Sequence, residues 1–279
     1  MAKFPVNGKA FIVTGACPGL DKWSIGAAIV TKLLDGGANV LLADMNGNVQ
    51  EFANKLGPRA FAMVGDVTDS TFRHSLITAP MEIWGLQPQG LITAAGITRD
   101  AFTVKPPKDG RPAVLASLDD IRLVLEVNLL APYCLARELV AHLLNVGMLS
   151  AKDPTLKVVI GFISSIVAHG NAGQAGYSMA KAAYLGLIET LLQEWGKYGV
   201  HVAGLFPGFT DTQMVEKVPP KILELQLLRT RSHKLHDPCD VAKQWVAALE
   251  EAEETQVWCD YFNHGAKAIR GANARLMAY

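Results

Sequence analysis

The sequence predicts an α/β fold with a single doubly wound domain, in which a mostly parallel seven-stranded sheet carries helices on both faces. Short apolar segments alternate with longer amphipathic segments along most of the chain, as in successive βαβ units. The short segments are mostly continuous apolar runs, which is typical of strands buried on both faces. Neither a Pro- or Ser-rich linker nor an internal repeat divides the 279 residues. We therefore expect one domain over residues 1–279.

The expected elements follow one another in order along the chain. Seven strands are predicted at 10–15, 38–44, 59–66, 90–96, 156–165, 200–208 and 255–262. Helices, with apolar residues at three- and four-residue spacing, are predicted at 25–35, 46–56, 70–84, 118–147, 174–198 and 238–253. Two stretches rich in Pro, Gly and charge, 104–117 and 145–157, are predicted to be loops.

Charge and cysteine usage exclude several classes of protein. Lys plus Arg and Asp plus Glu number 26 each, so no basic field is available for nucleic acid. The four cysteines are far apart and form no CxxC pair, which argues against a metal site and against a disulfide framework. We find no signal-peptide pattern and no apolar run long enough to span a membrane. We expect a soluble, cytoplasmic protein that binds neither nucleic acid nor membrane.

A glycine-rich turn follows the first predicted strand, in the stretch FIVTGACPGLDKWSIGAAIV (11–30). A strand, a glycine-rich turn and a helix present free backbone N–H groups to a phosphate. Gly15 and Gly19 fit a tight first turn, but Asp21 stands where the dinucleotide fingerprint has its next glycine. The next glycine along the chain is Gly26. By itself this turn is a weak indication of a dinucleotide site.

The stretch YSMAK places Tyr177 and Lys181 four residues apart inside a predicted helix. Side chains at this spacing share one helix face and approach each other. A free tyrosine has a pKa of about 10, and a neighbouring cation that favours the phenolate would make Tyr177 a usable general acid or base near neutral pH. The alternative is an ordinary helix pair, because this spacing is common by chance.

Other polar residues stand at strand ends or inside apolar segments. Ser164 and Ser165 close the fifth predicted strand, at the carboxyl edge where α/β sheets bind ligands. Asn128 lies in the middle of a long apolar helix, either for a function or as a core amide that bonds the backbone. The sixth strand ends in turn-forming and hydroxyl residues at the same edge, namely Pro207, Gly208, Thr210 and Thr212.

The order of these motifs resembles the short-chain dehydrogenase/reductase family over nearly the whole chain. The matching stretches, at about the family's spacing, are TGACPG, DV at 66–67, AAG at 94–96, ISS, YSMAK and PGFTDT. The resemblance implies a Rossmann-type domain and a catalytic set of Asn128, Ser165, Tyr177 and Lys181. Tyr177 would exchange a proton with the substrate oxygen, which the serine hydroxyl holds. Lys181 would bind the nicotinamide ribose and lower the tyrosine pKa, and Asn128 would position a water in the proton relay.

The glycine turn resembles the family's TGxxxGxG cofactor turn with its last glycine delayed by LDKWS. Ser24, Ile25 and Gly26 then form the end of the motif, and SIG is similar to the enoyl reductases of the superfamily. Ser24 is either a phosphate ligand or a plain helix N-cap. The resemblance implies a cofactor site made of Gly15, Gly19, Ser24, Ile25, Asp44, Asp66, Val67, Ala95, Gly96, Tyr177, Lys181, Pro207, Gly208, Thr210 and Thr212.

Asp44 ends the second predicted strand and decides the expected cofactor. Its carboxylate can accept hydrogen bonds from the adenosine ribose and would repel a 2′-phosphate, so NAD is favoured over NADP. No Arg or Lys stands at 16–17 or 45–46 to hold that phosphate. One alternative is that Asp44 only caps the next helix. Another is that Lys22, in the lengthened turn, holds the phosphate.

Three departures from the family pattern concern Thr93, the catalytic serine and the C-terminal end. Thr93 replaces a structural asparagine in the stretch TAAG. The spacing to the tyrosine is one residue short for Ser165 and fits Ser164, although ISSIV matches the family's strand end at Ser165. The C-terminal VDGG stretch is replaced by YFNHGAK (261–267), which puts any cofactor contact from that end in doubt.

The body of the chain is most similar to 3-oxoacyl-thioester reductases and hydroxysteroid dehydrogenases, through AAGITRDAF, GNAGQAGYSMAKA and FPGFTDTQMVEKVP. This implies NAD(H)-dependent interconversion of an apolar secondary alcohol and a ketone, such as a 3-hydroxyacyl thioester or a steroid. Gln193 stands where carrier-protein reductases offer an arginine, so a free or CoA-linked substrate fits better. Residues 209–236 are expected to form the substrate lid, or else a surface helix pair.

Two long apolar segments, 118–147 and 174–198, offer more surface than one sheet face can cover, and the resemblance implies that they pair into a dimer or a tetramer.

The alternative to an enzyme is a family member that binds NAD without turnover, as a regulatory or structural subunit. The complete Asn, Ser, Tyr and Lys set argues against it. A methyltransferase or another nucleotide binder would have no use for Tyr177 and Lys181.

Overall fold

A computed structural model describes residues 4–216, 218–251 and 256–259 of the protein. The last predicted strand, 255–262, extends past these limits, and the stretch YFNHGAK lies outside the described residues altogether. None of the helices described here combines the length and the apolar character that a membrane span requires.

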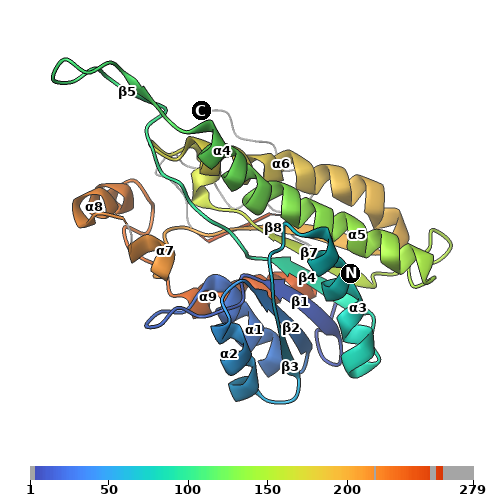
Figure 1. Ribbon diagram of the computed structural model, residues 1–279. Helices are drawn as coiled ribbons and strands as arrows, with labels where there is room; N and C mark the ends of the chain where they lie inside the picture. Colours follow the sequence, from blue (N-terminus) through green and yellow to red (C-terminus); the bar gives the residue numbers. More distant parts are fainter. Residues whose placement is uncertain (1–3, 217, 252–255, 260–279) are drawn as a thin grey trace.

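Seven parallel strands form the central sheet (Figure 1). They are β1 (Ala10–Thr14), β2 (Asn39–Asp44), β3 (Ala60–Val64), β4 (Pro88–Thr93), β7 (Val158–Ile163), β8 (Val200–Phe206) and β9 (Gln256–Trp258). Their order across the sheet is β3-β2-β1-β4-β7-β8-β9, and every neighbouring pair is parallel. The α/β, doubly wound fold class is therefore confirmed.

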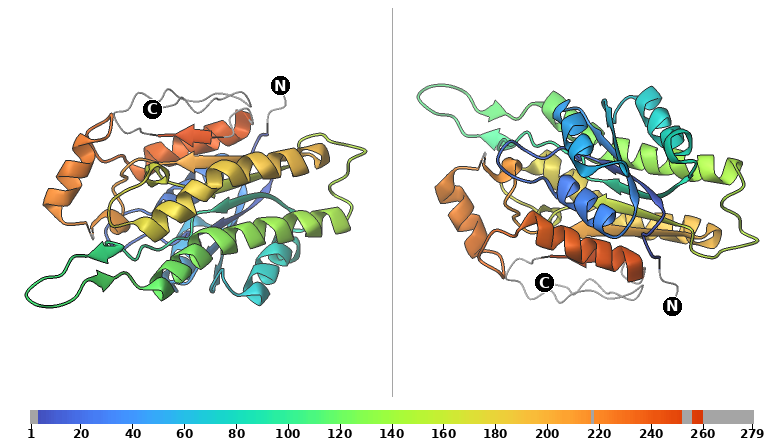
Figure 2. Two further views of the ribbon diagram at one scale, coloured as in Figure 1. Left: turned by 90° about the horizontal axis from the view of Figure 1, so that it is seen from above. Right: turned by 90° about the horizontal axis from the view of Figure 1, so that it is seen from below.

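Helices cover both faces of this sheet, as the views from above and below show (Figure 2). On one face α1 (Ile25–Asp35), α2 (Asn48–Leu56) and α9 (Pro238–Glu251) bury their apolar residues in one core cluster. On the other face α3 (Ser70–Trp84), α5 (Ala131–Asn145) and α6 (Ala175–Trp195) form a second cluster, and α4 (Leu118–Leu125) packs beside α6. The wholly buried strands β1, β7 and β8 separate the two clusters, which explains their continuous apolar sequences.

The predicted helix 118–147 is interrupted in its middle. Between α4 and α5 the chain forms one π-helical turn, η1 (Glu126–Leu130), which contains Asn128. A π turn is a frequent feature of functional sites because it displaces one residue from the regular α-helical ladder. The amphipathic pattern could not reveal it, since the apolar spacing continues through the turn.

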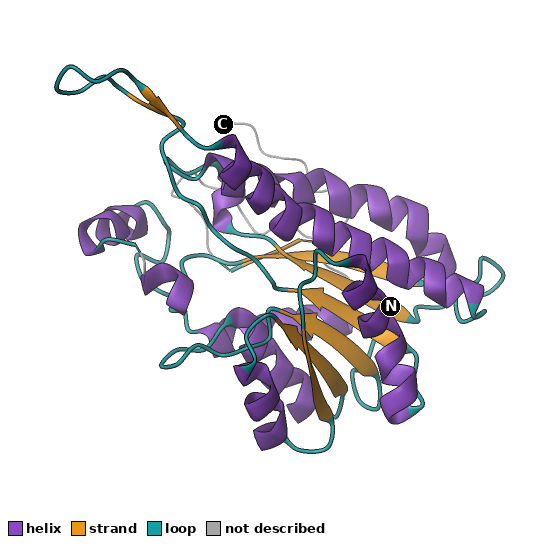
Figure 3. Ribbon diagram, in the orientation of Figure 1, coloured by secondary structure: helices purple, strands orange, loops and turns teal. Residues whose placement is uncertain are grey.

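The stretch 104–117, predicted to be a loop, contains a short antiparallel hairpin of β5 (Val104–Lys105) and β6 (Val114–Leu115). Asp109 and Gly110 both adopt positive φ, 51° and 74°, and reverse the chain at its tip. The hairpin projects from the body of the protein (Figure 3), and the residues of its two strands are all exposed. The stretch 145–157 forms no helix or strand after Asn145, as predicted.

The strand order reverses between β1 and β4, which are neighbours in the sheet although β2 and β3 follow β1 in sequence. In doubly wound sheets the crevice at the carboxyl ends of the strands at such a switch point is the usual ligand site. The segment 209–236 leaves β8 at this same edge and forms two short helices, α7 (Gln213–Glu216) and α8 (Pro220–Leu228). We call the segment 209–236 the lid.

Candidate active site

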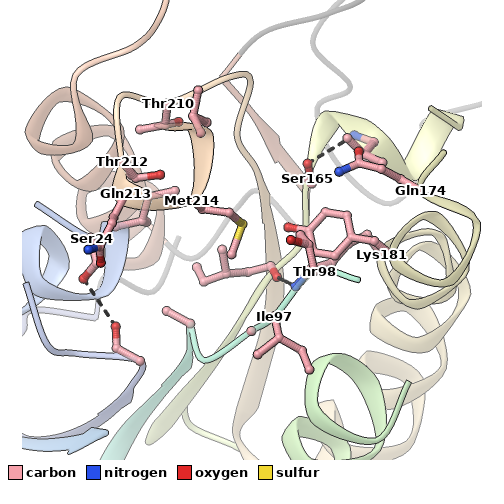
Figure 4. A pocket seen from close by; sticks show the side chains of 18 of the residues that line it. Ser24, Ile97, Thr98, Ser165, Gln174, Lys181, Thr210, Thr212, Gln213 and Met214 are labelled. Carbon is pink, nitrogen blue, oxygen red and sulfur yellow. Dashed lines mark hydrogen bonds between the residues drawn. The ribbon is translucent and has the colours of Figure 1, made fainter. Parts of the chain in front are cut away.

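A cavity of about 870 Å³ lies at the carboxyl edge of the sheet and is enclosed on one side by the lid. Figure 4 shows part of its wall, with Ser24, Thr212 and Gln213 on one side and Ser165 and Lys181 on the other. Every residue that the sequence predicted to contact the cofactor lines this cavity, as does Ser165. The structure therefore brings together residues that are spread over most of the chain.

The glycine turn meets the cavity between β1 and α1. Gly15 has a φ of 64°, and a Cβ atom there would lie 2.5 Å from the backbone nitrogen of Ala95, so only glycine fits. A Cβ atom on Gly26 would collide with the carbonyl of Gly15, which makes Gly26 the glycine of close helix packing despite its delayed position. The insertion therefore lengthens the turn but keeps the two close backbone contacts that require glycine, at Gly15 and at Gly26.

Ser24 is the N-cap of α1, because its hydroxyl oxygen accepts a hydrogen bond of 3.0 Å from the backbone nitrogen of Ala27. Ser24, Ile25 and Gly26 also line the cavity, so the N-terminus of α1 faces it. A helix N-terminus beside a glycine-only turn is suited to a phosphate group. These residues thus fit the pyrophosphate of a dinucleotide.

Asp44 lies half-buried in the cavity wall at the end of β2. Its Oδ2 accepts a hydrogen bond from the backbone nitrogen of Cys17 at 2.9 Å, and its Oδ1 accepts one from that of Asn46 at 3.0 Å. Each carboxylate oxygen has a further lone pair, so the group can still accept hydrogen bonds from a sugar. The bond to Cys17 fastens the glycine turn to β2.

Tyr177 and Lys181 lie on one face of α6, with the Lys181 Nζ 5.4 Å from the centre of the Tyr177 ring. Lys181 is buried, and its Nζ donates a hydrogen bond of 2.7 Å to the carbonyl of Ile163. Burial lowers the pKa of Lys181 to about 7. It also raises the pKa of Tyr177 to about 12, although a hydrogen bond with Ser165 acts in the opposite direction.

In the protein without a ligand the pKa of Tyr177 is therefore raised, and its lowering by Lys181 in the site with bound cofactor stays a prediction. Desolvation disfavours both charged forms, and at a pKa near 7 the amine carries only part of a positive charge at neutral pH. The helical spacing predicted the contact correctly. It could not report the burial, because burial depends on strands and loops remote from α6.

The two neighbouring serines have different surroundings. Ser164 is buried, and its hydroxyl donates a hydrogen bond of 2.8 Å to the backbone carbonyl of Lys181. Ser165 is only half-buried, and its hydroxyl bonds both the backbone nitrogen of Val167 and the side chain of Tyr177. Ser164 thus holds α6 against β7, whereas Ser165 is the hydroxyl at the phenol.

Asn128 does not line the cavity but lies behind Gly96, where an added Cβ atom would be 2.5 Å from the Asn128 Oδ1. Its Oδ1 accepts from the backbone nitrogen of Ile97, and its Nδ2 donates to the carbonyls of Ile97 and Val124. The side chain therefore fastens the π turn to the strand β4 end. The water-positioning role stays a prediction, and the side-chain amide has no hydrogen left to support it.

Several polar residues around Tyr177 belong to none of the sequence motifs. Gln174 donates a hydrogen bond of 2.9 Å to Asp100 and accepts one of 2.9 Å from Asn171, and all three line the cavity. Burial raises the pKa of Asp100. The negative charge of Asp100 adds to burial in raising the pKa of Tyr177. The signal available in the sequence was the clustering of polar residues directly after AAG and directly before the tyrosine.

Tyr184 was also missed. Its hydroxyl donates to the backbone carbonyl of Asn128 at 2.5 Å, and its ring stacks on Phe162. Thr93, the predicted departure from a structural asparagine, is buried and bonds the carbonyl of Gly161 at 3.4 Å.

Among the described residues, no group of three or more His, Cys, Asp or Glu side chains could hold a metal ion.

Comparisons with known proteins place these features in context. The model of the short chain dehydrogenase family matches residues 9–222. A human protein named (3R)-3-hydroxyacyl-CoA dehydrogenase is 30% identical over 243 residues, which cover 83% of this chain and 84% of the human one. Acetoacetyl-CoA reductase of a Synechocystis strain is 33% identical over 254 residues, 89% of this chain and 90% of that protein. The 3-oxoacyl-[acyl-carrier-protein] reductase FabG of Thermotoga maritima is 26% identical over 242 residues, 85% and 89% of the two chains.

Proposed function

Because this chain belongs to the short-chain dehydrogenase family, we propose that it is an NAD(H)-dependent oxidoreductase that interconverts a secondary alcohol and a ketone. The observation that carries the proposal is the pair of Tyr177, half-buried in the cavity wall, and the buried Lys181, with the Ser165 hydroxyl bonded to the phenol. A protein that only bound a nucleotide would have no use for a phenol and an amine held together at the cavity wall.

Tyr177 is the proposed general acid and base. With a pKa of about 12 it holds its proton at neutral pH, so it can donate that proton to a substrate oxygen in the reductive direction. In the oxidative direction a protonated Lys181, 5.4 Å from the ring, favours the phenolate. Ser165 holds the substrate oxygen beside the phenol. When bound, the nicotinamide supplies or takes up the hydride.

NAD is the proposed cofactor because of the carboxylate of Asp44. The cations that line the cavity are Arg99, Lys105 and Lys181, and none of them belongs to the segments that flank Asp44. Lys22, the alternative holder of a 2′-phosphate, does not line the cavity and pairs with Asp211 and Glu216 instead. A 2′-phosphate beside Asp44 would therefore meet a like charge, and no cation of the described cavity wall flanks Asp44 to offset it.

A 3-hydroxyacyl thioester is the proposed substrate class, with a steroid or another apolar alcohol as the alternative. Apolar residues of the cavity wall come from both the loop after β4 and the lid, for example Phe102, Met214 and Ile222. The names of the human and Synechocystis relatives refer to hydroxyacyl-CoA and acetoacetyl-CoA. An acyl chain in such a cavity would gain the usual free energy of apolar burial.

The decisive experiment compares Tyr177→Phe with the wild-type protein. Reduction of acetoacetyl-CoA and of a cyclic ketone is followed through NADH absorbance, and NADH affinity is measured separately by fluorescence. We expect turnover to fall at least about a hundredfold, the usual contribution of a general acid, while NADH affinity stays nearly unchanged. More than about a tenth of the activity remaining would remove Tyr177 from this role. NADH binding without turnover of any ketone by the wild type would favour the non-catalytic alternative.

We also propose that the protein assembles into a dimer or a tetramer. Large apolar side chains are exposed on the helices of one face, including Leu123 of α4 and Leu144 of α5, at 42% and 37%. Leu130, at 46%, extends this surface between them. Burying such side chains against a second copy is favourable. Light scattering at micromolar concentration should give at least twice the 30.0 kDa mass of the chain, and a monomer would contradict the proposal.

A further inference from the structure

The insertion that lengthens the glycine turn reaches the lid through Lys22. The Lys22 Nζ lies 2.6 Å from the Asp211 Oδ1 and 3.3 Å from the Glu216 Oε1. Hydrogen bonds to these two carboxylates raise the pKa of Lys22, so the amine stays charged over the physiological range. One cation of the cofactor turn therefore bridges two acidic residues at either end of α7.

The insertion is folded so that it presents this cation. The backbone nitrogen of Gly19 donates a hydrogen bond of 2.8 Å to the carbonyl of Lys22, which closes a tight turn. A Cβ atom on Gly19 would lie 2.9 Å from that carbonyl and 3.3 Å from the Gln213 Oε1. The turn thus contacts α7 through its backbone as well as through Lys22.

The lid has a firm base and an exposed outer part. At its base the backbone nitrogen of His236 donates to the carbonyl of Phe209, and that of Asp211 donates to the carbonyl of His236, both at 2.9 Å. Beyond this base α8 has no buried residue, and Leu225 and Leu228 are 64% and 58% exposed. The ion pairs of Lys22 with Asp211 and Glu216 therefore connect α7, which lies between this base and α8, to the glycine turn.

Lys22 itself does not line the cavity. Residues near it in the glycine turn do, and so do residues of the lid near Asp211 and Glu216. Gly19 and Ser24 line it from the turn, and Thr212, Gln213 and Met214 line it from the lid. Figure 4 shows Ser24, Thr212 and Gln213 close together on the same part of the wall. Lys22 therefore lies where it can hold these two walls together without touching a ligand in the cavity.

We propose that Lys22 is a positioning residue that couples the cofactor turn to the lid, so that the lid retains the cofactor and the cofactor in turn favours the closed lid. This inference rests on the proposed function, since it assigns a role in the same site. Coupling of this kind is reciprocal, because a contact that strengthens binding at one wall must strengthen closure of the other by the same factor.

The test uses Lys22→Gln, which removes the charge and keeps most of the side chain. Release of NADH, or of NADPH if it binds more tightly, is measured by stopped-flow fluorescence. We expect release about two- to fivefold faster than from the wild type, the range of exposed ion-pair networks. Added salt should accelerate release from the wild type and have little further effect on the variant. In turnover, substrate KM should rise more than kcat falls.

A matched control is Lys32→Gln, which removes a partly exposed lysine of α1 that pairs with Asp35 at 3.2 Å and contacts no lid residue through that pair. It should leave release unchanged. The charge-swapped variant with Lys22→Glu, Asp211→Lys and Glu216→Gln, in which no carboxylate is left facing the new Glu, should recover most of the slow release. Unchanged release in Lys22→Gln, or an equal change in the control, would overturn the inference.

A second measurement needs no cofactor. Amide hydrogen exchange at Val215, whose backbone nitrogen bonds the carbonyl of Thr212, should be faster in Lys22→Gln than in the wild type. Equal exchange in the two proteins would show that Lys22 does not hold the lid. If neither NADH nor NADPH binds the wild type, the proposed function fails, and the exchange measurement still decides whether the contact positions α7.

Discussion

The two ends of the cavity satisfy their polar groups in different ways. At the catalytic end Lys181, Ser164 and Asn128 are buried, and each bonds backbone groups of the protein itself. At the other end Asp44 is half-buried and keeps lone pairs beyond those that Cys17 and Asn46 use. The catalytic end is thus fixed by the protein alone, whereas the Asp44 end is left for a ligand to complete.

The fixed geometry of the catalytic end lowers the stability of the folded protein, because it buries the amine of Lys181. The Lys181 amine is held between the carbonyl of Ile163 and two aromatic rings, 5.4 Å and 5.5 Å from the ring centres of Tyr177 and Tyr184. Removing its ammonium from water is unfavourable, which is why its pKa falls to about 7. The Asp44 end keeps its carboxylate within reach of water and of a ligand.

The largest expected effect tests this cost through Lys181→Met. The pKa of Lys181 is about 7 when folded against 10.5 for the free group, so between these values the unfolded chain binds a proton that the folded one does not. Wild-type stability should rise with pH through this window. The full penalty, present below pH 7, has an upper limit of roughly 5 kcal/mol. The variant should therefore be more stable than the wild type at pH 7 and lose that advantage near pH 10.

Urea unfolding of the ligand-free protein at pH 7 and pH 10 measures this difference. Measurements stop at pH 10, near the pKa of free tyrosine, because the raised pKa of Tyr177, about 12, makes the protein lose stability at higher pH. Burial also raises the pKa of Cys17 to about 11, which lowers stability from about pH 9 upward but does so equally in the wild type and the variant. Lys32→Met, at the exposed ion pair with Asp35, is the control and should leave the pH dependence unchanged. The same pH slope in Lys181→Met and in the wild type would show that the buried amine is not the cause.

The next effect tests the open end through Asp44→Ala. If the carboxylate accepts the ribose hydroxyls, the wild type should prefer NAD over NADP by at least about a hundredfold in kcat/KM, since a phosphate adds repulsion to the lost hydrogen bonds. The variant should lose most of that preference. Steady-state kinetics with both cofactors on one ketone checks it. Equal use of NADP by the wild type would contradict the assignment of Asp44.

Sequence patterns predicted which residues lie at both ends of the cavity. They did not predict the burial and the pKa values of Tyr177 and Lys181 at the catalytic end. The strand end at Asp44 and the turn at Gly15 are local features, so their places followed directly from the chain. The surroundings of Tyr177 and Lys181 depend on β7, on loops at 98–101 and 171–174 and on the π turn, which no local pattern joins. For the same reason the sequence could not distinguish Ser164, which bonds the backbone of α6, from Ser165, whose hydroxyl lies at the phenol.

The rim of the cavity was predicted least well. The hairpin in 104–117 escaped notice because its four strand residues are too few to show a period. The lengthened glycine turn was noticed, but its contact partner, the lid, lies 189 residues further along the chain. A long-range ion pair leaves no trace in local composition, so the sequence could only raise Lys22 as a candidate for the 2′-phosphate.

The smallest expected effect concerns Tyr184→Phe and separates structural from catalytic groups at the buried end. The Tyr184 hydroxyl donates to the Asn128 carbonyl in a site with no exposure to solvent, and its loss leaves that carbonyl without this donor. We expect the free energy of unfolding to fall by about 1–2 kcal/mol, with the ring still stacked on Phe162. Because the hydroxyl acts on the protein's own backbone, NADH affinity should stay within about twofold of the wild type. The matched control is Tyr198→Phe, at a tyrosine that is only partly buried against the same core cluster. It should change neither the free energy of unfolding nor the NADH affinity. A large fall in affinity with unchanged stability would instead assign Tyr184 to the ligand and would contradict the view that the protein alone fixes this end of the cavity.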